Sequence, residues 1–459
     1  MYHIDFSRPI KIHFMGIGGI SMSGLAEILL DKGFTITGSD SRRSPITELL
    51  ESKGIPVFYG QRAANIQDDL DLVVYTAAIH EDNEEYQEVI RRNIPCFDRA
   101  ELLGQIMANY KNSIAVSGTH GKTTTTSMLS QILLQANCDP TISVGGMLKS
   151  IDGNIRVGQS SNFITEACEY TNSFLKFNPR IELILNVEED HMDFFKDIDD
   201  IRNSFKLFTE KLPDDGLLII NGEIPDVHFF TKDLKCRSVL YGLTPDCDYY
   251  ASNVSFNEFA QPSFDLIING KRTGHFQLSV TGEHNVSNAL ASAAAAIELG
   301  ISIDDIKKGL LDYKGTDRRF EKKGELGGVT IIDDYAHHPT EIRATLAAAS
   351  KYPHKKLWCV FQPHTYTRTK AFLDDFAEAL SMADAVVLAD IYAAREKNTG
   401  DIHSKDIQKL LIESGNEAYY FPSFDEIENF LLLNCTQDDL LITMGAGDIV
   451  LIGEKLLGK

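Results

Sequence analysis

The sequence predicts an α/β protein of three domains. Short apolar runs of strand length alternate with helical patterns along almost the whole chain, which is typical of parallel α/β domains. A length of 459 residues corresponds to three domains at roughly 150 residues each. We place these domains at residues 1–108, 109–314 and 315–459, with a linker at residues 109–112. The first is expected to be a Rossmann-like doubly wound parallel sheet, and the third a Rossmann-like α/β domain.

The composition is that of an ordinary globular protein, with 43% hydrophobic and 24% charged residues. A net charge of −22 argues against nucleic acid or an anionic membrane as a partner. We find no apolar run of membrane-spanning length and no secretory signal pattern, so we expect a cytoplasmic protein. Seven scattered cysteines without C-x-x-C spacing suit reduced thiols and disfavour a zinc site.

The central domain begins with a glycine-rich turn between a predicted strand and a predicted helix. Gly118 and Gly121 form the turn, and Lys122 and Thr123 follow it. In phosphate-binding loops, backbone N–H groups and the helix N-terminus face the anion, the lysine reaches the outer phosphates and a hydroxyl binds Mg²⁺. The turn therefore has the parts of a phosphate site in the right order.

Two residues separate these glycines where the usual P-loop has four, so the pattern indicates a shortened variant. We interpret it as the ATP site of a P-loop-type ATPase domain. A plain strand–helix turn that contains lysine is the alternative interpretation. The ATP-binding residues predicted from this stretch are Gly118, Thr119, His120, Gly121, Lys122, Thr123 and Thr124.

A second glycine-rich turn, at residues 16–24, follows the first predicted strand. Its glycines, and Asp40 about 20 residues further on, are similar to the dinucleotide-binding fingerprint. Ser21 stands in the place of the third glycine, which disfavours NAD. A nucleotide diphosphate at this helix N-terminus is consistent with the helix dipole, and a turn without a ligand is the alternative.

Acidic residues and one histidine follow two predicted strands of the central domain. Open α/β sheets bind ligands at the C-terminal ends of their strands, and Mg²⁺ prefers oxygen ligands. These side chains are therefore candidates for Mg²⁺ coordination, although histidine is an atypical ligand for this ion. Loop residues without a ligand are the alternative for each. The candidates are Glu166, Glu169, Asp190, His191 and Asp193.

Short strands at residues 249–256, 264–268 and 274–280 predict a small antiparallel sheet inside the central domain. The helix that follows carries Asn285 and Asn288 on one face, because they are three residues apart. Asparagine both donates and accepts hydrogen bonds, as an adenine edge requires, and helix capping is the alternative role.

In the third domain, polar residues follow four predicted strands. Since the ends of such strands form the ligand-binding edge of an α/β sheet, this domain is expected to present a ligand face. A helix is expected to begin near His338, with Pro339 in its first turn. The four strands are expected at residues 329–334, 357–361, 385–389 and 440–443.

Together these motifs resemble those of the Mur ligases, in order and over essentially the whole chain. The Gly-Thr-His-Gly-Lys-Thr loop alone marks a wider superfamily that includes folylpolyglutamate synthases. The first stretch and Phe361–Arg368 are more specific to the branch that adds alanine. The matching stretches are His13–Gly24, Gly118–Thr124, Glu166, Asp190–His191, Gly282–Asn285 and Asp333–Glu341.

The resemblance implies an ATP-dependent ligase of peptidoglycan precursor synthesis. Its first domain would bind UDP-N-acetylmuramate, its central domain would bind ATP and Mg²⁺, and its third domain would close over both. The lactyl carboxylate of the UDP-sugar would attack the γ-phosphate, and L-alanine would displace phosphate from the resulting acyl phosphate. The sequence predicts no oligomeric state.

The resemblance also implies roles for particular residues. At the UDP-sugar it places Gly18, Gly19, Ser21 and Asp40. At the metal it places Thr123, Glu166 and His191, and at adenine it places Asn285 and Asn288. Arg319 would meet the transferring phosphoryl group, while His337, His338 and Arg368 would face the amino acid and the sugar. The catalytic residues predicted in this way are Lys122, Arg319, His338 and Arg368.

Two positions depart from parts of the family. Lys206 lies roughly where one branch carries a carbamylated lysine, and Thr365 stands where some relatives have arginine. Two other functions are open alternatives. One is a ligase that attaches a recycled murein tripeptide to the same UDP-sugar. The other is a non-catalytic sensor of UDP-sugar and ATP, which the joint presence of Lys122, Thr123 and Glu166 disfavours.

Overall fold

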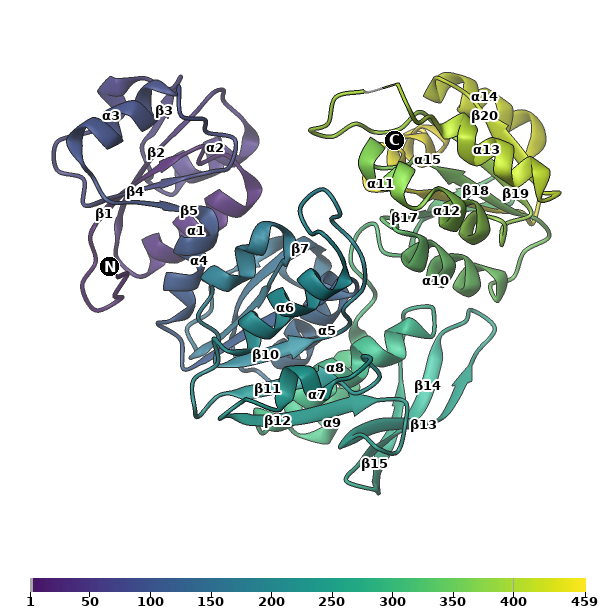
Figure 1. Ribbon diagram of the computed structural model, residues 1–459, viewed down its shortest axis with the longest axis horizontal. Coiled ribbons are helices and arrows are strands. Elements are labelled where there is room, and N and C mark those ends of the chain that lie inside the picture. Colours follow the sequence, from purple (N-terminus) through teal and green to yellow (C-terminus); the bar gives the residue numbers. More distant parts are fainter. Residues whose placement is uncertain (1–2, 399) are drawn as a thin grey trace.

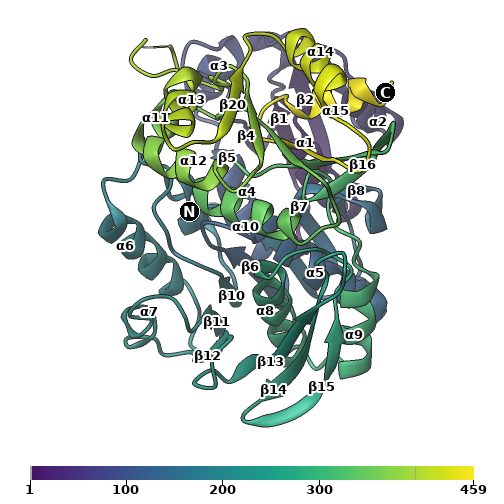
Figure 2. The same cartoon turned by 90° about the vertical axis from the view of Figure 1, so that its right-hand side faces the viewer.

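The computed structural model describes residues 3–398 and 400–459 and contains three sheets in succession along the chain. In both ribbon views the N-terminal and C-terminal parts lie on the same side of the central part (Figures 1 and 2). Each sheet combines parallel strands with helices, which confirms the predicted α/β class. The domain boundaries at residues 108 and 314 stay predictions.

The N-terminal sheet is entirely parallel, with strand order β3-β2-β1-β4-β5. The order reverses beside β1, which is where doubly wound sheets open a crevice for ligands. Asp98 caps α4 as its position suggests, because its side chain accepts the backbone N–H of Glu101. The strands are β1 (Lys11–Met15), β2 (Thr35–Asp40), β3 (Val57–Tyr59), β4 (Leu72–Tyr75) and β5 (Cys96–Asp98). The helices are α1 (Ile20–Asp31), α2 (Pro45–Ser52), η1 (Ala63–Asn65), α3 (Glu84–Arg92) and α4 (Arg99–Met107).

The central sheet has ten strands in the order β15-β14-β13-β12-β11-β10-β6-β9-β7-β8. The antiparallel strands β13–β15 continue this sheet and do not form a separate one, because β13 pairs in parallel with β12. Strand β15 begins and ends three residues earlier than expected. The strands are β6 (Asn112–Ser117), β7 (Thr141–Leu148), β8 (Gly153–Arg156), β9 (Asn162–Glu166), β10 (Ile181–Ile184), β11 (Leu217–Asn221), β12 (Arg237–Gly242), β13 (Tyr249–Phe256), β14 (Pro262–Ile268) and β15 (Lys271–Gln277).

Helices cover both faces of the central sheet. On one face α5 packs against α8 and α9, and the buried alanines of α8 let these helices approach closely. On the other face α6 packs among the phenylalanines that continue into the core of the N-terminal part. The helices are α5 (Lys122–Gln135), η2 (Lys149–Ile151), η3 (Tyr170–Lys176), α6 (Ile198–Thr209), α7 (His228–Thr231), α8 (His284–Glu298) and α9 (Ile303–Asp312).

The expected linker at residues 109–112 is instead part of a packed junction. Tyr110 is only 5% exposed, stacks on Phe163 with ring centroids 5.0 Å apart, and donates its hydroxyl to Thr141 at 3.2 Å. Asn112 already belongs to β6. The buried side chain of Tyr110 anchors the chain at this junction. Its neighbours in the sequence are polar, which is why the stretch was expected to be a linker.

The C-terminal sheet has the order β16-β17-β21-β18-β19-β20, with only β16 antiparallel. The four strands expected to form a ligand face are β17, β21, β18 and β19, which are neighbours in this sheet. The strands are β16 (Glu321–Leu326), β17 (Val329–Asp334), β18 (Leu357–Phe361), β19 (Ala385–Leu388), β20 (Glu417–Tyr420) and β21 (Leu440–Met444). The helices are α10 (Pro339–Ser350), α11 (Tyr366–Ala371), α12 (Leu373–Leu380), α13 (Ser404–Glu413), α14 (Phe424–Asn434) and α15 (Val450–Leu456).

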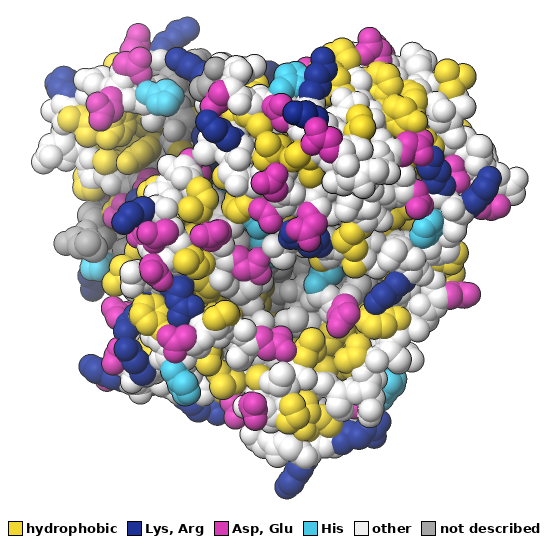
Figure 3. All heavy atoms as spheres, turned by 45° about the vertical axis from the view of Figure 1, so that its right-hand side comes forward, with side chains coloured by type: hydrophobic (Ala, Val, Ile, Leu, Met, Phe, Trp, Pro, Cys, Tyr) yellow, Lys and Arg dark blue, Asp and Glu magenta, His cyan; other side chains and the backbone are white. Residues whose placement is uncertain are grey.

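Among the described residues, no helix is both long and apolar enough to cross a bilayer. On the face shown in Figure 3, Lys and Arg side chains are interspersed with Asp and Glu. Charge at any one site therefore has to be judged from individual contacts and not from the overall net charge.

Strand β10 carries an unusual buried acid. Glu182 is 0% exposed, and neither of its carboxylate oxygens has a hydrogen-bond partner. Burial raises its pKa well above the ordinary value of 4.5, and the distant charge of Lys211 opposes this only weakly. This carboxyl group ionises more easily in the unfolded chain than in the folded protein. The free energy of unfolding therefore decreases as pH rises above 4.5, the ordinary pKa of the group.

Replacing Glu182 by leucine is expected to stabilise the protein, by about 1–3 kcal/mol at neutral pH, since an unpaired buried polar group is removed. The gain should be larger at pH 8 than at pH 6. Glu182→Gln should gain less, because an unpaired polar group remains, and its gain should also grow with pH because the ionisable group is gone. Urea unfolding followed by circular dichroism measures both effects, and a Leu variant that is less stable at both pH values would contradict the expectation.

Candidate active site

The turn between β6 and α5 has the backbone of a phosphate loop. Gly118 (φ +140°) and Gly121 (φ +85°) adopt conformations that favour glycine, and α5 begins at Lys122 directly after them. A Cβ atom at Gly121 would lie 2.6 Å from Asn288 Oδ1 of α8. The loop is therefore packed against α8 as closely as a glycine permits.

Lys122 is held in this turn as a partly buried cation, with its side chain 15% exposed. Its Nζ lies 2.9 Å from Glu169 Oε2 and donates to the carbonyl of Thr119 at 3.2 Å. Burial alone would lower the pKa of Lys122, but the charge and the hydrogen bond of Glu169, together with the other groups around the amine, outweigh burial and raise it. The site thus holds a permanent positive charge beside the N-terminus of α5, as an anion-binding site requires.

Oxygen ligands suitable for a hard divalent cation meet next to Lys122. Thr123 Oγ1 donates to Glu166 Oε2 at 3.1 Å, and Glu166 Oε1 accepts the backbone N–H of Gly145. His191 lines the same cavity, with its Nε2 3.7 Å from carboxylate oxygens of both Glu169 and Asp190. Burial lowers the pKa of His191, which favours the neutral ring.

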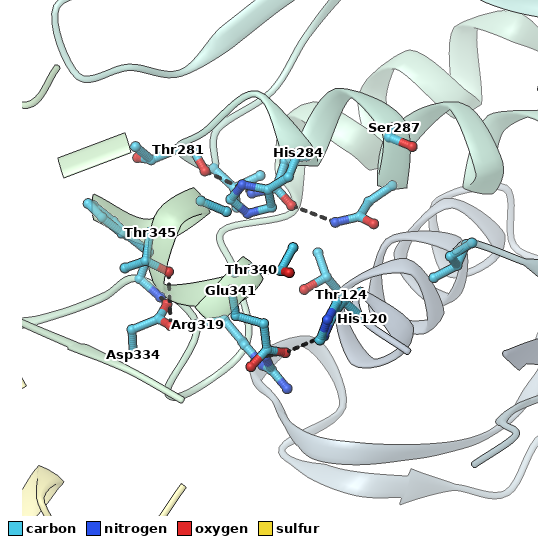
Figure 4. Close-up of a pocket in the computed structure, with 18 of the residues that line it drawn as sticks. His120, Thr124, Thr281, His284, Ser287, Arg319, Asp334, Thr340, Glu341 and Thr345 are labelled. Carbon is cyan, nitrogen blue, oxygen red and sulfur yellow. Dashed lines mark hydrogen bonds and ion pairs between the residues drawn. The ribbon is translucent and has the colours of Figure 1, made fainter. Parts of the chain in front are cut away.

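Two adjoining cavities surround this loop, between the central and C-terminal parts. We call the cavity of about 340 Å³ the nucleotide cavity, and it is bordered by α8 and α10. We call the cavity of about 530 Å³ the transfer cavity, and it contains Lys122, Thr123 and Glu166. Side chains from both parts face the nucleotide cavity in Figure 4. The residues that line both cavities are His120, Gly121, Arg319 and Glu341.

The two predicted asparagines line the nucleotide cavity from α8. Asn285 donates to the carbonyl of Thr281 at 2.8 Å, and Asn288 donates to Asn285 Oδ1 at 3.0 Å. Helix capping was the wrong alternative, because Glu283 occupies the N-cap and both asparagines lie inside α8. Their amides form a polar edge beside the phosphate loop.

Arg319 enters the site from a strained turn. Its neighbours Arg318 (φ +61°) and Phe320 (φ +49°) are both left-handed, which costs energy for residues with a Cβ atom. Asp334 holds the turn by accepting the backbone N–H of Phe320 at 2.7 Å. Burial raises the pKa of Asp334 to about 6, against the opposing charge of Arg319.

Arg368 connects the C-terminal part to the central part. Its Nη2 lies 2.8 Å from Asp190 Oδ1, and the two side chains are only 9% and 7% exposed. Thr365 (φ +67°) is the N-cap of α11 just before it. Arg368 and Asp190 close one side of the site with a buried ion pair.

The two predicted histidines separate in the structure. His337 lines the transfer cavity, and burial lowers its pKa to about 3, so it is neutral. His338 lies outside the linings of both cavities and caps α10, where its Nδ1 accepts the backbone N–H of Thr340 at 3.3 Å. This position suits a residue that caps a helix better than one that transfers a proton in the cavity.

Lys206 is remote from these groups. It lies on α6, where its Nζ pairs with Asp233 at 2.7 Å and approaches the Phe229 ring at 5.1 Å. Lys206 lines neither cavity, so it does not bridge metal ions as a carbamylated lysine would.

The predicted UDP-sugar residues gather after β1. Gly18 donates its backbone N–H to Asp40 Oδ2 at 2.8 Å, and Gly19 is the N-cap of α1. Ser21 accepts a hydrogen bond from Arg99 at 3.2 Å. Sequence reasoning missed this arginine, although it directly follows β5 at the same edge of the sheet. It adds a cation where an anionic ligand is expected.

Three more residues were missed, although two lie in a recognised motif. Asp334 is the last residue of β17 and Glu341 lies in the first turn of α10, and both line the nucleotide cavity. Asn186, which follows β10, accepts the backbone N–H of His120 at 2.7 Å. Their shared signal is a position at the C-terminal end of a parallel strand or in the first turn after it.

Three family models cover most of the chain. The model described as the Mur ligase family, catalytic domain, matches residues 11–111. The Mur ligase middle domain matches residues 116–296, and the model named Mur ligase, glutamate ligase domain, matches residues 318–447.

Full-length relatives and solved structures agree with these matches. A UDP-N-acetylmuramate–L-alanine ligase of Agathobacter rectalis is 61% identical over 459 residues, with all of both chains covered. The crystal structure of UDP-N-acetylmuramate–alanine ligase from Thermotoga maritima is 30% identical, with a TM-score of 0.79 over 98% of each chain. A murein peptide ligase from Psychrobacter arcticus is 26% identical, with a TM-score of 0.69 over 98% of each chain. The chain belongs to the Mur ligase family.

Proposed function

We propose that the protein is an ATP-dependent ligase that joins L-alanine to the lactyl carboxylate of UDP-N-acetylmuramate through an acyl phosphate. The observation that carries this proposal is the convergence of Lys122 and Arg319 on one cavity from two different domains. Full-length relatives at about 60% identity bear the name of this activity and support the choice of substrates.

Mur ligases use ATP, and the nucleotide and transfer cavities provide places for its base and its phosphates. Asn285 and Asn288 would face adenine, while the loop Gly118–Thr124 would surround the phosphates. The hydroxyl of Thr123 and the carboxylate of Glu166 fit Mg²⁺, which binds few protein oxygens and keeps several waters. His191 would complete the metal site. When bound, Mg²⁺ neutralises phosphate charge.

Phosphoryl transfer depends chiefly on positioning and on charge neutralisation. Lys122 and the N–H groups of the loop would hold the outer phosphates, and Arg319 would approach the transferring group from the opposite domain. The lactyl carboxylate would attack phosphorus as ADP leaves. The amine of L-alanine would then attack the acyl carbon and release inorganic phosphate.

An acyl phosphate hydrolyses if water reaches it, so the cavity has to close. The buried pair of Arg368 and Asp190 would maintain this closed arrangement. His337 lines the cavity as a neutral ring, and Arg368 would face the amino acid. His338 caps α10 and lines neither cavity, so it is not part of this proposal as the base.

The first domain would bind the UDP-sugar. Gly18, Gly19 and Ser21 at the start of α1 would hold its diphosphate, with Asp40 near the nucleoside and Arg99 adding charge neutralisation. Substrates of this kind are made inside the cell, and all seven cysteines are free thiols, so the cytoplasm is the proposed location.

The choice of L-alanine over a murein tripeptide is supported by the full-length relatives, which bear the name of the alanine-adding ligase. The murein tripeptide remains the second candidate, because a murein peptide ligase shares the fold.

Release of phosphate from ATP is expected to require both UDP-N-acetylmuramate and L-alanine, since the acyl phosphate forms on one and is consumed by the other. The measurement is phosphate release with a panel of amino acids and the murein tripeptide, with and without the UDP-sugar. Preference for the tripeptide would favour the recycling ligase, and absence of turnover with every acceptor would favour a sensor.

Gly121→Ala is expected to weaken ATP binding about 10-fold or more, equivalent to about 1.4 kcal/mol, because the new Cβ would displace the loop from Asn288. Gly54→Ala is the matched control, since Gly54 has a similar φ of +89° but has no atom within 4 Å of the added Cβ. Both variants should lose stability through the same left-handed backbone strain, Gly121→Ala more because of its contact with Asn288, but only Gly121→Ala should change ATP affinity in titration calorimetry. Unchanged affinity in Gly121→Ala would contradict the placement of the phosphates.

A further inference from the structure

A carboxylate of the C-terminal part lies in the wall between the nucleotide and transfer cavities. Glu341, in the first turn of α10, lines both cavities and is 14% exposed. Its Oε1 lies 3.2 Å from His120 Nδ1 and 3.9 Å from Arg319 Nη1. Its Oε2 accepts the backbone N–H of His337 at 3.1 Å. Figure 4 shows Glu341 pointing toward His120, with Arg319 beside the pair.

These contacts cross the boundary between two domains. His120 belongs to the phosphate loop, where its backbone N–H donates to Asn186 Oδ1. Glu341 and Arg319 belong to the C-terminal part. The preceding residue, Thr340, donates its hydroxyl to Glu188 Oε2 at 3.0 Å, which is a second contact across the same boundary. The start of α10 is therefore attached both to the phosphate loop and to the segment that follows β10.

The charges of this cluster support one another. Burial would raise the pKa of Glu341, but the groups around it, His120 and Arg319 among them, together outweigh burial and lower it well below the ordinary value of 4.5. Burial would lower the pKa of His120, but its hydrogen bond to Glu341 and the charges of Glu341, Glu188 and Asp190 together outweigh burial and raise it. An ionised carboxylate therefore lies between two groups with cationic character, which would repel each other without it.

We propose that Glu341 is a positioning residue that holds His120 of the phosphate loop and Arg319 of the C-terminal domain in the arrangement needed for phosphoryl transfer. This inference rests on the proposed function, because that function assigns Arg319 to the transferring phosphoryl group. Glu341 acts through these neighbours and not on the substrates. Phosphates and the lactyl carboxylate are anions, which a bare carboxylate would repel.

Glu341→Gln tests the proposal, since it keeps the shape of the side chain and removes its charge. In a rapid-quench single turnover with ATP and UDP-N-acetylmuramate but no L-alanine, the rate of ADP formation at saturating ATP should fall about 10- to 100-fold, as expected for misplaced catalytic groups. The dissociation constant of ATP should change less than about 3-fold, because Lys122 and the loop N–H groups remain. Glu341→Asp, which keeps the charge, should recover part of the rate.

Asp375→Asn is the matched control. Asp375 pairs with Arg343 of the same helix α10 at 3.4 Å, is 51% exposed, and lies outside both cavities. This variant should keep the rate of the unmodified protein. Combining Glu341→Gln with His120→Asn should cost little more than Glu341→Gln alone, because both changes break the same contact.

Several results would overturn the proposal. They are a rate in Glu341→Gln within 2-fold of the unmodified protein, a loss confined to ATP affinity, and an equal loss in Asp375→Asn. Fully multiplicative losses in the double variant would also overturn it. Failure of the proposed function is distinguishable, because the unmodified protein would then form no ADP in response to the UDP-sugar.

Discussion

The buried ion pair of Lys122 and Glu169 is the interaction on which the site depends. A lysine amine at this depth would tend to lose its proton, and the carboxylate 2.9 Å away keeps it charged before any nucleotide arrives. The glycine turn at residues 118–121 directs this cation and the first N–H groups of α5 into the same cavity. The proposed binding of phosphate requires Lys122 to exchange part of its contact with Glu169 for phosphate oxygens.

The other half of the site belongs to the C-terminal part. The proposed phosphoryl transfer therefore depends on how the central and C-terminal parts contact each other. Three contacts join the C-terminal part to the loops that follow β6 and β10. They are Arg368 with Asp190, Thr340 with Glu188, and Glu341 with His120. Charged groups buried at such a junction are strongly dependent on their partners. This arrangement explains the polar residues that follow β17 and β18.

Local sequence patterns predicted much of the fold and the phosphate loop Gly118–Thr124. Strands β13, β17 and β18 follow the expected positions, because alternation and apolar runs act over a few residues. Strand β7 was missed because Gly145 and Gly146 interrupt its pattern. The contact of His120 with Glu341 joins residues 221 apart, and that of Ser21 with Arg99 joins residues 78 apart. Only tertiary structure reveals such pairs, and it also shows that His338 caps a helix.

The central claim is that the γ-phosphate of ATP passes directly to the lactyl carboxylate inside the closed cavity. The most direct measurement uses UDP-N-acetylmuramate labelled with oxygen-18 in that carboxylate, with ATP and L-alanine, and mass spectrometry of the released phosphate. One labelled oxygen is expected in each phosphate, because the bond from the acyl carbon to that oxygen breaks when the amine attacks. Phosphate without label would mean that water attacked ATP and that the γ-phosphate did not pass to the carboxylate.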